Sequence, residues 1–165
     1  MKFDGYAQTH YIIASENDHY EQIRTLIVEY ANSLGFDLCF QNFELEMRDF
    51  PAEYASPDGC LILAYQGGFA VGCVGLRMFA PGICEMKRLY VRPSYRGQKI
   101  GRRLAEILIE RAKEKGYTHM RLDTLPTMTE AINLYRRLGF MEISPYRHNP
   151  VPGALFMELD MRSGP

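Results

Sequence analysis

The segment from Arg96 to Arg103 combines two glycines with four cationic side chains. Gly97 and Gly101 allow a ligand to approach the backbone closely. The segment lies at a predicted junction between a strand and a helix, where free backbone amides and the positive end of the helix dipole favour an anion. The predicted chemistry is phosphate binding, and a pyrophosphate fits the several cations better than a single charge does: Arg96, Lys99, Arg102 and Arg103.

Composition alone leaves a second interpretation of this segment open, an ordinary helix start with surface cations. The spacing differs from the Gly-x-Gly-x-x-Gly of a dinucleotide-binding fold. Gly101 is also not followed by the Lys-Ser/Thr of a P-loop. Both nucleotide-binding folds are therefore disfavoured.

Thiol chemistry is a different possibility, raised by four cysteines at positions 39, 60, 73 and 84. They form no Cys-x-x-Cys pair, and no histidine is near enough in sequence to indicate a local metal site, so no metal is predicted. Buried reduced thiols are the favoured interpretation. A thiol hydrolase remains an alternative, because a fold can bring a cysteine to one of the scattered histidines 10, 19, 119 and 148.

Hydrophobic patterning predicts the elements that position these residues. Gln66-Gly67-Gly68 has the composition of a hairpin turn, and Thr127 with Glu130 is typical of a capping box. The expected strands are 9–14, 61–65, 69–78, 83–91, 117–123 and 154–161, and the expected helices are 15–34, a shorter one within 36–50, 98–115 and one ending at Gly139. A strand-helix-strand crossover through 83–123 then predicts a mixed α/β fold, with a mostly antiparallel sheet flanked by helices.

Length and charge bound the class of protein. The 165 residues are 47% hydrophobic and contain no repeat or linker, which predicts one domain over residues 1–165. With 19 basic and 20 acidic residues, the whole chain offers no electrostatic reason for a nucleic-acid or anionic-membrane partner. No run is apolar enough for a membrane span or a signal peptide, so we expect a cytoplasmic protein. A homodimer is the default expectation for its assembly.

Arg96 to Gly101 resembles the acetyl-coenzyme A signature Gln/Arg-x-x-Gly-x-Gly/Ala of the GCN5-related N-acetyltransferases (GNAT). The similarity extends upstream to Glu85–Val91 and downstream to Ala131–Phe140. It covers roughly residues 60–160, whereas residues 1–59 resemble the family only in their strand-helix-helix layout. The resemblance implies a GNAT-like fold and acetyl-coenzyme A as acyl donor.

Several residues acquire cofactor-binding roles from the resemblance. It implies that the segment around the signature holds the pyrophosphate, and that part of the preceding strand pairs with the pantetheine arm like an added strand. The residues so implied are Leu89, Tyr90, Val91, Arg96, Gly97, Gln98, Lys99, Ile100, Gly101, Arg102, Arg103, Asn133 and Arg137. Lys99 stands where the signature has its first glycine, and we expect it to serve in the cradle if its φ is negative.

The resemblance also implies direct attack of a primary amine on the thioester. Tyr135 matches the family's acid, Glu85 resembles a strand glutamate used as a base, and a backbone amide near Leu89 would stabilise the oxyanion. From the residues alone, Tyr135 is a core aromatic. Glu85 is equally well a surface or salt-bridged side chain beside Lys87 and Arg88, and a water chain is an alternative base.

The acceptor side is the least informed by sequence. In the family, the segment after the first helix usually lines the acceptor side, and the resemblance places Phe36, Phe40, Phe43 and Glu46 there, with Tyr146 in the loop before the last strand. Ordinary core packing is the favoured interpretation of the aromatic residues. If Glu46, Arg77 or Asp123 faces the pocket, its charge would select among small-molecule or peptide amines. The predicted function is therefore N-acetylation of a primary amine, and the alternative is a non-catalytic coenzyme A-binding sensor or interaction module.

Overall fold

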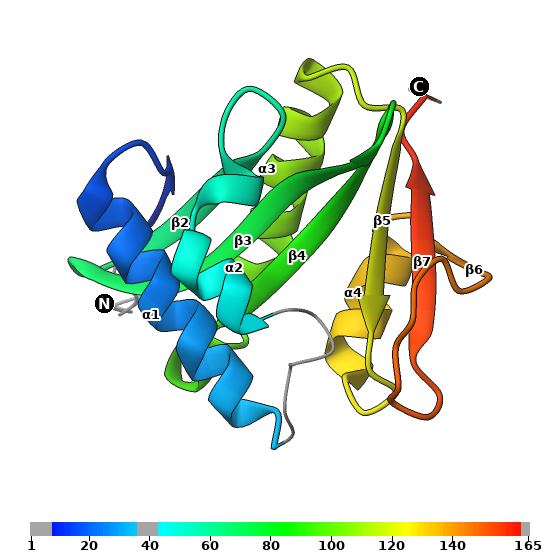
Figure 1. The fold of residues 1–165 in the computed structure, drawn as a ribbon. Helices are drawn as coiled ribbons and strands as arrows, with labels where there is room; N and C mark the ends of the chain where they lie inside the picture. Colours follow the sequence, from blue (N-terminus) through cyan, green and yellow to red (C-terminus); the bar gives the residue numbers. More distant parts are fainter. Residues whose placement is uncertain (1–7, 36–42, 163–165) are drawn as a thin grey trace, which may run out of the picture.

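The computed structural model describes residues 8–35 and 43–162, and within them a seven-stranded sheet runs through the molecule (Figure 1). Its order is β1-β2-β3-β4-β5-β7-β6. The strands are β1 Thr9–Ile13, β2 Cys60–Gln66, β3 Phe69–Ala80, β4 Ile83–Val91, β5 His119–Thr124, β6 Met141–Ile143 and β7 Leu155–Asp160. Neighbouring strands are antiparallel except β4 and β5, which are parallel. The predicted mixed, mostly antiparallel sheet is confirmed.

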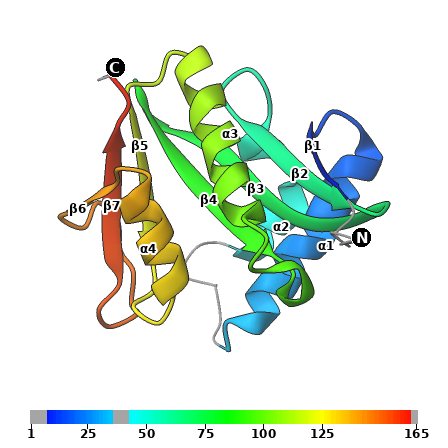
Figure 2. The ribbon, with the colours of Figure 1, turned by 180° about the vertical axis from the view of Figure 1, so that it is seen from behind.

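Helices cover both faces of the sheet. Those of the described residues are α1 Asn17–Ser33, α2 Phe43–Asp49, α3 Ile100–Glu114 and α4 Thr129–Arg137, with 3-10 turns η2 Ala52–Tyr54 and η3 Pro93–Tyr95. Helices α1 and α2 lie on one face and α3 and α4 on the other, as Figures 1 and 2 show from opposite sides. Helix α3 is the crossover that joins β4 to its parallel neighbour β5. Within the described ranges, none of these helices has the length and hydropathy to cross a bilayer.

Two hydrophobic cores lie on opposite sides of the sheet, and β2 contributes to both by simple alternation. Leu61 and Leu63 pack with α1, whereas Ile62 and Ala64 pack with α3. The helices contribute buried apolar residues at helical spacing to these cores. They are Ile23, Leu26 and Ile27 on α1 and Leu104, Leu108 and Ala112 on α3. Each fully buried leucine or isoleucine stabilises the fold by about 1.5–3 kcal/mol.

The hairpin between β2 and β3 has the predicted turn. Gly67 and Gly68 have φ angles of 59° and 82°. Two consecutive positive φ angles are the geometry of a type I′ turn, which matches the twist of the flanking strands. The turn between these strands is therefore confirmed, and it brings Gln66 opposite Phe69.

Two expectations near the C-terminal end are corrected by the structure. The capping box at Thr127 is wrong, because a turn from Leu125 to Met128 precedes α4 and Met128 occupies the N-cap without a side-chain cap bond. The three-residue strand β6, which pairs with β7, has no counterpart in the prediction. Its length gives too little alternation to be seen in sequence.

Candidate active site

A cleft of about 850 Å³ opens where β4 and β5 separate. The two strands pair only at their beginnings, with Ile83–Glu85 opposite His119–Arg121. Beyond this point the walls of the cleft come from β4, the loop that leads into α3, β5 and α4, with Tyr30 added from α1. The cleft therefore lies where β4 and β5 splay apart.

A β-bulge shapes the β4 wall of this cleft. Tyr90 lies opposite Cys73 but Lys87 lies opposite Gly75, so β4 advances by one residue more than β3 over this interval. Arg88, inside the bulge, has a φ of 59°. Because a bulge bends its strand and turns backbone groups out of the ladder, it directs the backbone around Leu89 toward the cleft.

The loop before α3 forms a concave arrangement of backbone amides at one end of the cleft. Gly97 and Lys99 have φ angles of 84° and 63°, and α3 begins immediately afterwards at Ile100. Left-handed residues on either side of Gln98 can turn neighbouring amides toward a common centre, an arrangement called an anion-binding nest, and the helix dipole adds positive potential. A Cβ built on Gly101 would meet only the side chain of Val91, at 3.6 Å, so the floor of this nest is open.

The condition stated for Lys99 in the cradle, a negative φ, is not met. Its φ of 63° places it in the left-handed region, and Lys99 is the N-cap of α3 without a side-chain cap bond. Glycine, the residue of the family signature at this position, adopts the left-handed conformation without steric cost. The amide direction survives in this chain, and the lysine carries the backbone strain instead.

The predicted cofactor residues divide into those that line the cleft and those that do not. On its walls lie Leu89, Tyr90, Val91, Arg96, Gly97, Lys99, Ile100, Gly101, Arg102 and Arg137. The side chain of Gln98 instead accepts a hydrogen bond from Gln66 at 2.7 Å, and Arg103 pairs with Glu106 and Glu110. Asn133 is exposed on α4 and is not among the described residues that line the cleft.

Tyr135 presents a buried phenol to the cleft from α4. Its ring packs on Phe140 with centroids 5.7 Å apart. Burial raises the pKa of the Tyr135 hydroxyl well above its ordinary value, and Tyr30 and Asp123 add to the rise. Tyr135 is therefore a neutral proton donor at physiological pH.

Lys87 and Asp123 face each other from β4 and β5, where the cleft begins to open. The Lys87 Nζ lies 3.5 Å from the Asp123 Oδ1, and both side chains are buried. Asp123 also accepts a hydrogen bond from Asn149 at 3.1 Å. Burial lowers the pKa of the Lys87 amine to about 8, although Asp123 acts in the opposite direction. No role was predicted for Lys87 from sequence, where it is one of three adjacent or alternate charged residues, with Glu85 and Arg88, in a strand that is otherwise apolar.

Glu85 is buried next to the cleft but is not among its described lining residues. Arg77 donates from Nε to its Oε1 at 3.0 Å, and the Arg147 Nη2 lies 2.5 Å from the same oxygen. Tyr146 donates its hydroxyl to the other oxygen at 2.9 Å. The carboxylate is therefore held by two guanidinium groups and a phenol, and its ion-pair partners are not the neighbours Lys87 and Arg88.

Residues 20–140 match the sequence profile of the acetyltransferase (GNAT) family. The chain belongs to this family. An uncharacterised N-acetyltransferase of Schizosaccharomyces pombe is 42% identical over 143 residues, which cover 86% of this chain and 88% of that relative. The protein is thus an acyltransferase of the GNAT type by both profile and relative.

Solved structures share its fold. A GNAT-family acetyltransferase of Staphylococcus aureus has a TM-score of 0.77 at 21% identity, over 94% of this chain and all of its own. An acetyltransferase of Salmonella typhimurium, solved with its cofactor acetyl-coenzyme A, has a TM-score of 0.65 at 17% identity, over 94% of this chain and 95% of its own. At these identities the likeness shows the GNAT fold alone.

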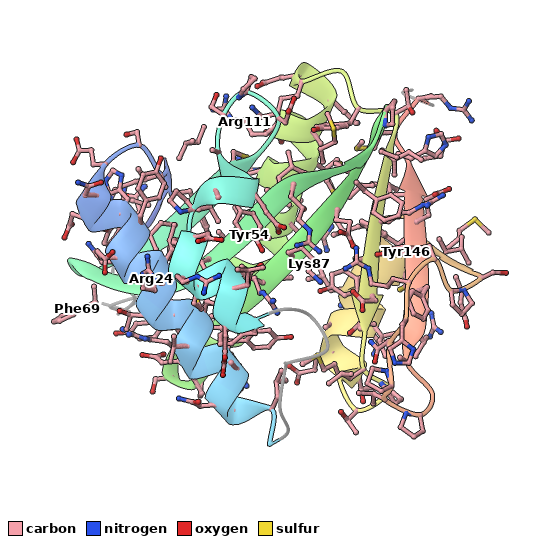
Figure 3. All side chains as sticks on the ribbon, viewed as in Figure 1. Arg24, Tyr54, Phe69, Lys87, Arg111 and Tyr146 are labelled. Carbon is pink, nitrogen blue, oxygen red and sulfur yellow. The ribbon has the colours of Figure 1, made fainter. Side chains whose placement is uncertain are left out.

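The acceptor side of this GNAT fold is rich in paired charges. Glu46 of α2 pairs with Arg88 at 2.9 Å and accepts the Tyr54 hydroxyl at 2.5 Å, and the Arg88 guanidinium lies over the Phe43 ring at 5.4 Å. Asp123 lines the cleft, whereas Glu46 and Arg77 are outside its described lining. Tyr146, labelled in Figure 3, lies beside the last strands of the sheet. Its ring packs edge-on against Phe79 and Phe156. Phe36 and Phe40 lie outside the described residues.

The cysteines within the described residues are inert in this arrangement. Cys60, Cys73 and Cys84 are free and buried. Burial raises the pKa of both the Cys73 and the Cys84 thiols to about 12, so neither forms a thiolate at neutral pH. No cluster of metal-binding side chains occurs in the described parts of the chain. These observations disfavour the thiol hydrolase alternative, with Cys39 outside the described residues.

Proposed function

We propose that this GNAT protein transfers the acetyl group of acetyl-coenzyme A to a primary amine by direct attack of the amine on the thioester. The observation that carries the proposal is one continuous cleft that joins the anion nest at Gly97–Gly101 to the buried phenol of Tyr135. A pyrophosphate at one end and a reacting thioester at the other match these two features.

The residues of the cleft fit the acetyl donor. The amides of the nest and the cations Arg96 and Arg102 suit the pyrophosphate, and the backbone of Leu89–Val91 suits the pantetheine amides as an added strand. Bound acetyl-coenzyme A supplies an activated thioester carbonyl. The backbone amide at Leu89, turned by the bulge, would donate to the oxygen of this carbonyl as negative charge develops.

Proton transfer assigns roles to Asp123 and Tyr135. The acceptor arrives as an ammonium ion and must lose a proton before it attacks. The carboxylates among the described lining residues are Asp123 and Glu130, and Asp123 is the buried one beside Lys87. We assign proton acceptance to Asp123, and to Tyr135 the protonation of the departing sulfur. Glu85 supports the site through its contacts with Arg77 and Arg147.

The test is detection of acetylated product by mass spectrometry, with a panel of polyamines, amino acids, aminoglycosides and lysine peptides and a no-enzyme control. In Tyr135→Phe, we expect kcat to fall by about 10- to 1,000-fold with the affinity for acetyl-coenzyme A retained, because general acid catalysis has this size. Tyr20→Phe is the matched control, since Tyr20 lies on α1 and bonds the carbonyl of Ala14.

Two outcomes would contradict the proposal in different ways. An unchanged kcat in Tyr135→Phe would remove Tyr135 from the acid role. Binding of acetyl-coenzyme A without product from any amine would favour the alternative, a coenzyme A-binding module without chemistry.

A further inference from the structure

Lys87 is an amine inside the acyl-transfer cleft for which the proposed reaction has no use. It lies on β4 immediately before the bulge, lines the cleft, and is 6% exposed (Figure 3). A lysine is seldom buried to this extent, because desolvation of its ammonium is costly. The pairing with Asp123 offsets this cost, and it keeps the amine on the wall of the cleft.

The side chain of Lys87 points to the face of the sheet from which an acceptor would approach. Cys84 and Met86 of β4 pack in the core beneath α3, so the alternate residues Glu85 and Lys87 face the side of α1 and α2. Tyr30 of α1 lines the same cleft as Lys87. The Lys87 amine therefore lies on the face of the sheet that α1 and α2 cover, beside Asp123, the proton acceptor of the proposed reaction.

The charged surroundings of Lys87 include a proton acceptor. Asp123 Oδ1 lies 3.5 Å from Nζ. The other charged groups that act on Lys87 are Arg88 and Glu85 of β4 and Arg77 of β3. The titratable groups that line the same cleft include Tyr30 of α1, and Glu130 and Tyr135 of α4. Burial outweighs the nearby carboxylates and lowers the pKa of the amine to about 8, which leaves a reactive neutral fraction at slightly alkaline pH.

We propose that Lys87 is itself an acyl acceptor, which takes the acetyl group from acetyl-coenzyme A bound in the cleft when no external amine is present. The inference rests on the proposed function. The Lys87 nitrogen forms a bond to the carbonyl carbon and the carbon–sulfur bond breaks. The amine proton passes to Asp123, and the leaving sulfur takes the proton of Tyr135. Exchange with solvent restores both groups, so the products are Nζ-acetyl-lysine and free coenzyme A.

Self-acetylation would close the site to further turnover. An amide is a poor acyl donor, so the acetyl group stays on Lys87. The acetylated side chain is larger and uncharged, and it leaves the buried Asp123 carboxylate without its cation. External amines therefore compete with Lys87 for the same acetyl group, and their absence switches the protein off.

The experiment uses the purified protein and acetyl-coenzyme A alone, from pH about 7 to about 10, with peptide mapping by mass spectrometry. We expect acetylation of Lys87 with a rate that rises with pH to a plateau and has its midpoint near 8, the value of its pKa. Excess coenzyme A should suppress it at least about tenfold by occupying the cleft. Gly101→Glu, whose side chain would fill the nest, should abolish it while the fold still melts cooperatively.

Lys113, exposed in the last turn of α3, is the internal control for non-enzymatic labelling. Its acetylation does not depend on the cleft, so excess coenzyme A should leave it unchanged. Lys113→Arg should leave the labelling of Lys87 unchanged.

The outcomes separate this inference from the proposed function. If calorimetry shows bound acetyl-coenzyme A and external amines are acetylated while Lys87 stays unmodified, the self-acetylation inference alone is overturned. The self-acetylation inference is also overturned if excess coenzyme A does not reduce the labelling of Lys87, as is expected for Lys113. If acetyl-coenzyme A does not bind, the proposed function fails with it.

Discussion

Lys99 holds a backbone conformation that a side chain makes costly. Its φ of 63° brings Cβ close to the following carbonyl, at a cost of about 1–2 kcal/mol relative to an ordinary conformation. The same conformation turns the neighbouring amides into the nest before α3. The strain at Lys99 is therefore located in the segment that is proposed to hold the pyrophosphate.

Substitutions at Lys99 can separate backbone strain from charge. Lys99→Gly and Lys99→Ala both remove the cation, but only glycine relieves the left-handed strain. We expect Lys99→Gly to be more stable than Lys99→Ala by about 1 kcal/mol in urea unfolding, even though glycine raises the entropy of the unfolded chain. Equal stability of the two variants would show that position 99 is not left-handed in solution. The affinity of Lys99→Ala for acetyl-coenzyme A, compared with that of the wild type, measures how much the lysine charge contributes to binding.

Burial moves two groups of the cleft toward their uncharged forms. The pKa of the Tyr135 phenol is raised and the pKa of the Lys87 amine is lowered, in both cases chiefly by desolvation. A protonated phenol can donate a proton, and a partly neutral amine can act as a nucleophile. The same physical cause thus keeps the proton on Tyr135 and removes it from a fraction of Lys87.

At the scale of elements, β4 organises the site. Its beginning is held in the parallel ladder with β5, and its end carries the bulge and leads into the nest before α3. Glu85 lies where the ladder stops, and its contacts join β4 to Arg77 of β3 and to Arg147 in the loop before β7. We interpret Glu85 as the residue that fixes where the splay begins.

Glu85→Gln tests this supporting role. Removing the charge leaves two arginines facing a neutral side chain in a buried place, and breaking such a pair costs about 3–5 kcal/mol. We expect a loss of unfolding free energy of about 3 kcal/mol, with acetyl-coenzyme A binding retained. Glu53→Gln is the matched control, because Glu53 pairs with the same Arg77 but its side chain is 58% exposed, so its loss costs less than about 1 kcal/mol. A stable Glu85→Gln protein with a large loss of kcat would instead support the base role.

At the scale of the whole molecule, the sheet separates two cores and the cleft lies between its two halves. Strands β1 to β4 and strands β5 to β7 are joined through the short parallel ladder, with α3 as the covalent crossover. The cleft therefore opens where β4 and β5, strands of nine and six residues, pair over three residues only. A cofactor can pair with β4 there without displacing another strand.

Lys87 links the stability of the whole fold to pH. Its folded pKa of about 8 lies below the ordinary value of about 10.4, so between these values the unfolded chain binds more protons than the folded chain. The contribution of Lys87 to the unfolding free energy therefore increases as the pH rises from about 8 to about 10.4. The unfolding free energy of the wild type relative to Lys87→Met should increase by at most about 3 kcal/mol between pH 8 and 10, as measured by urea unfolding at several pH values. A difference that does not change with pH would contradict the lowered pKa.

The sequence by itself determined the family, the order of the main elements and the location of the anion nest. Those features depend on local patterns, namely helical periodicity in α3, the glycine turn at 67–68 and the spacing of Arg96, Gly97 and Gly101. The local sequence is sufficient to predict these features, because turns and amphipathic helix faces are set by residues that are close together in the chain.

Only the tertiary structure decided which side chains meet. The partners of Glu85 come from positions 77, 146 and 147, and the pairing of Lys87 with Asp123 joins two strands across the splay. The positive φ of Lys99 likewise follows from how the loop must enter α3. Such contacts depend on strand register and on the β4 bulge, because a shift of one residue would turn each side chain to the other face of the sheet.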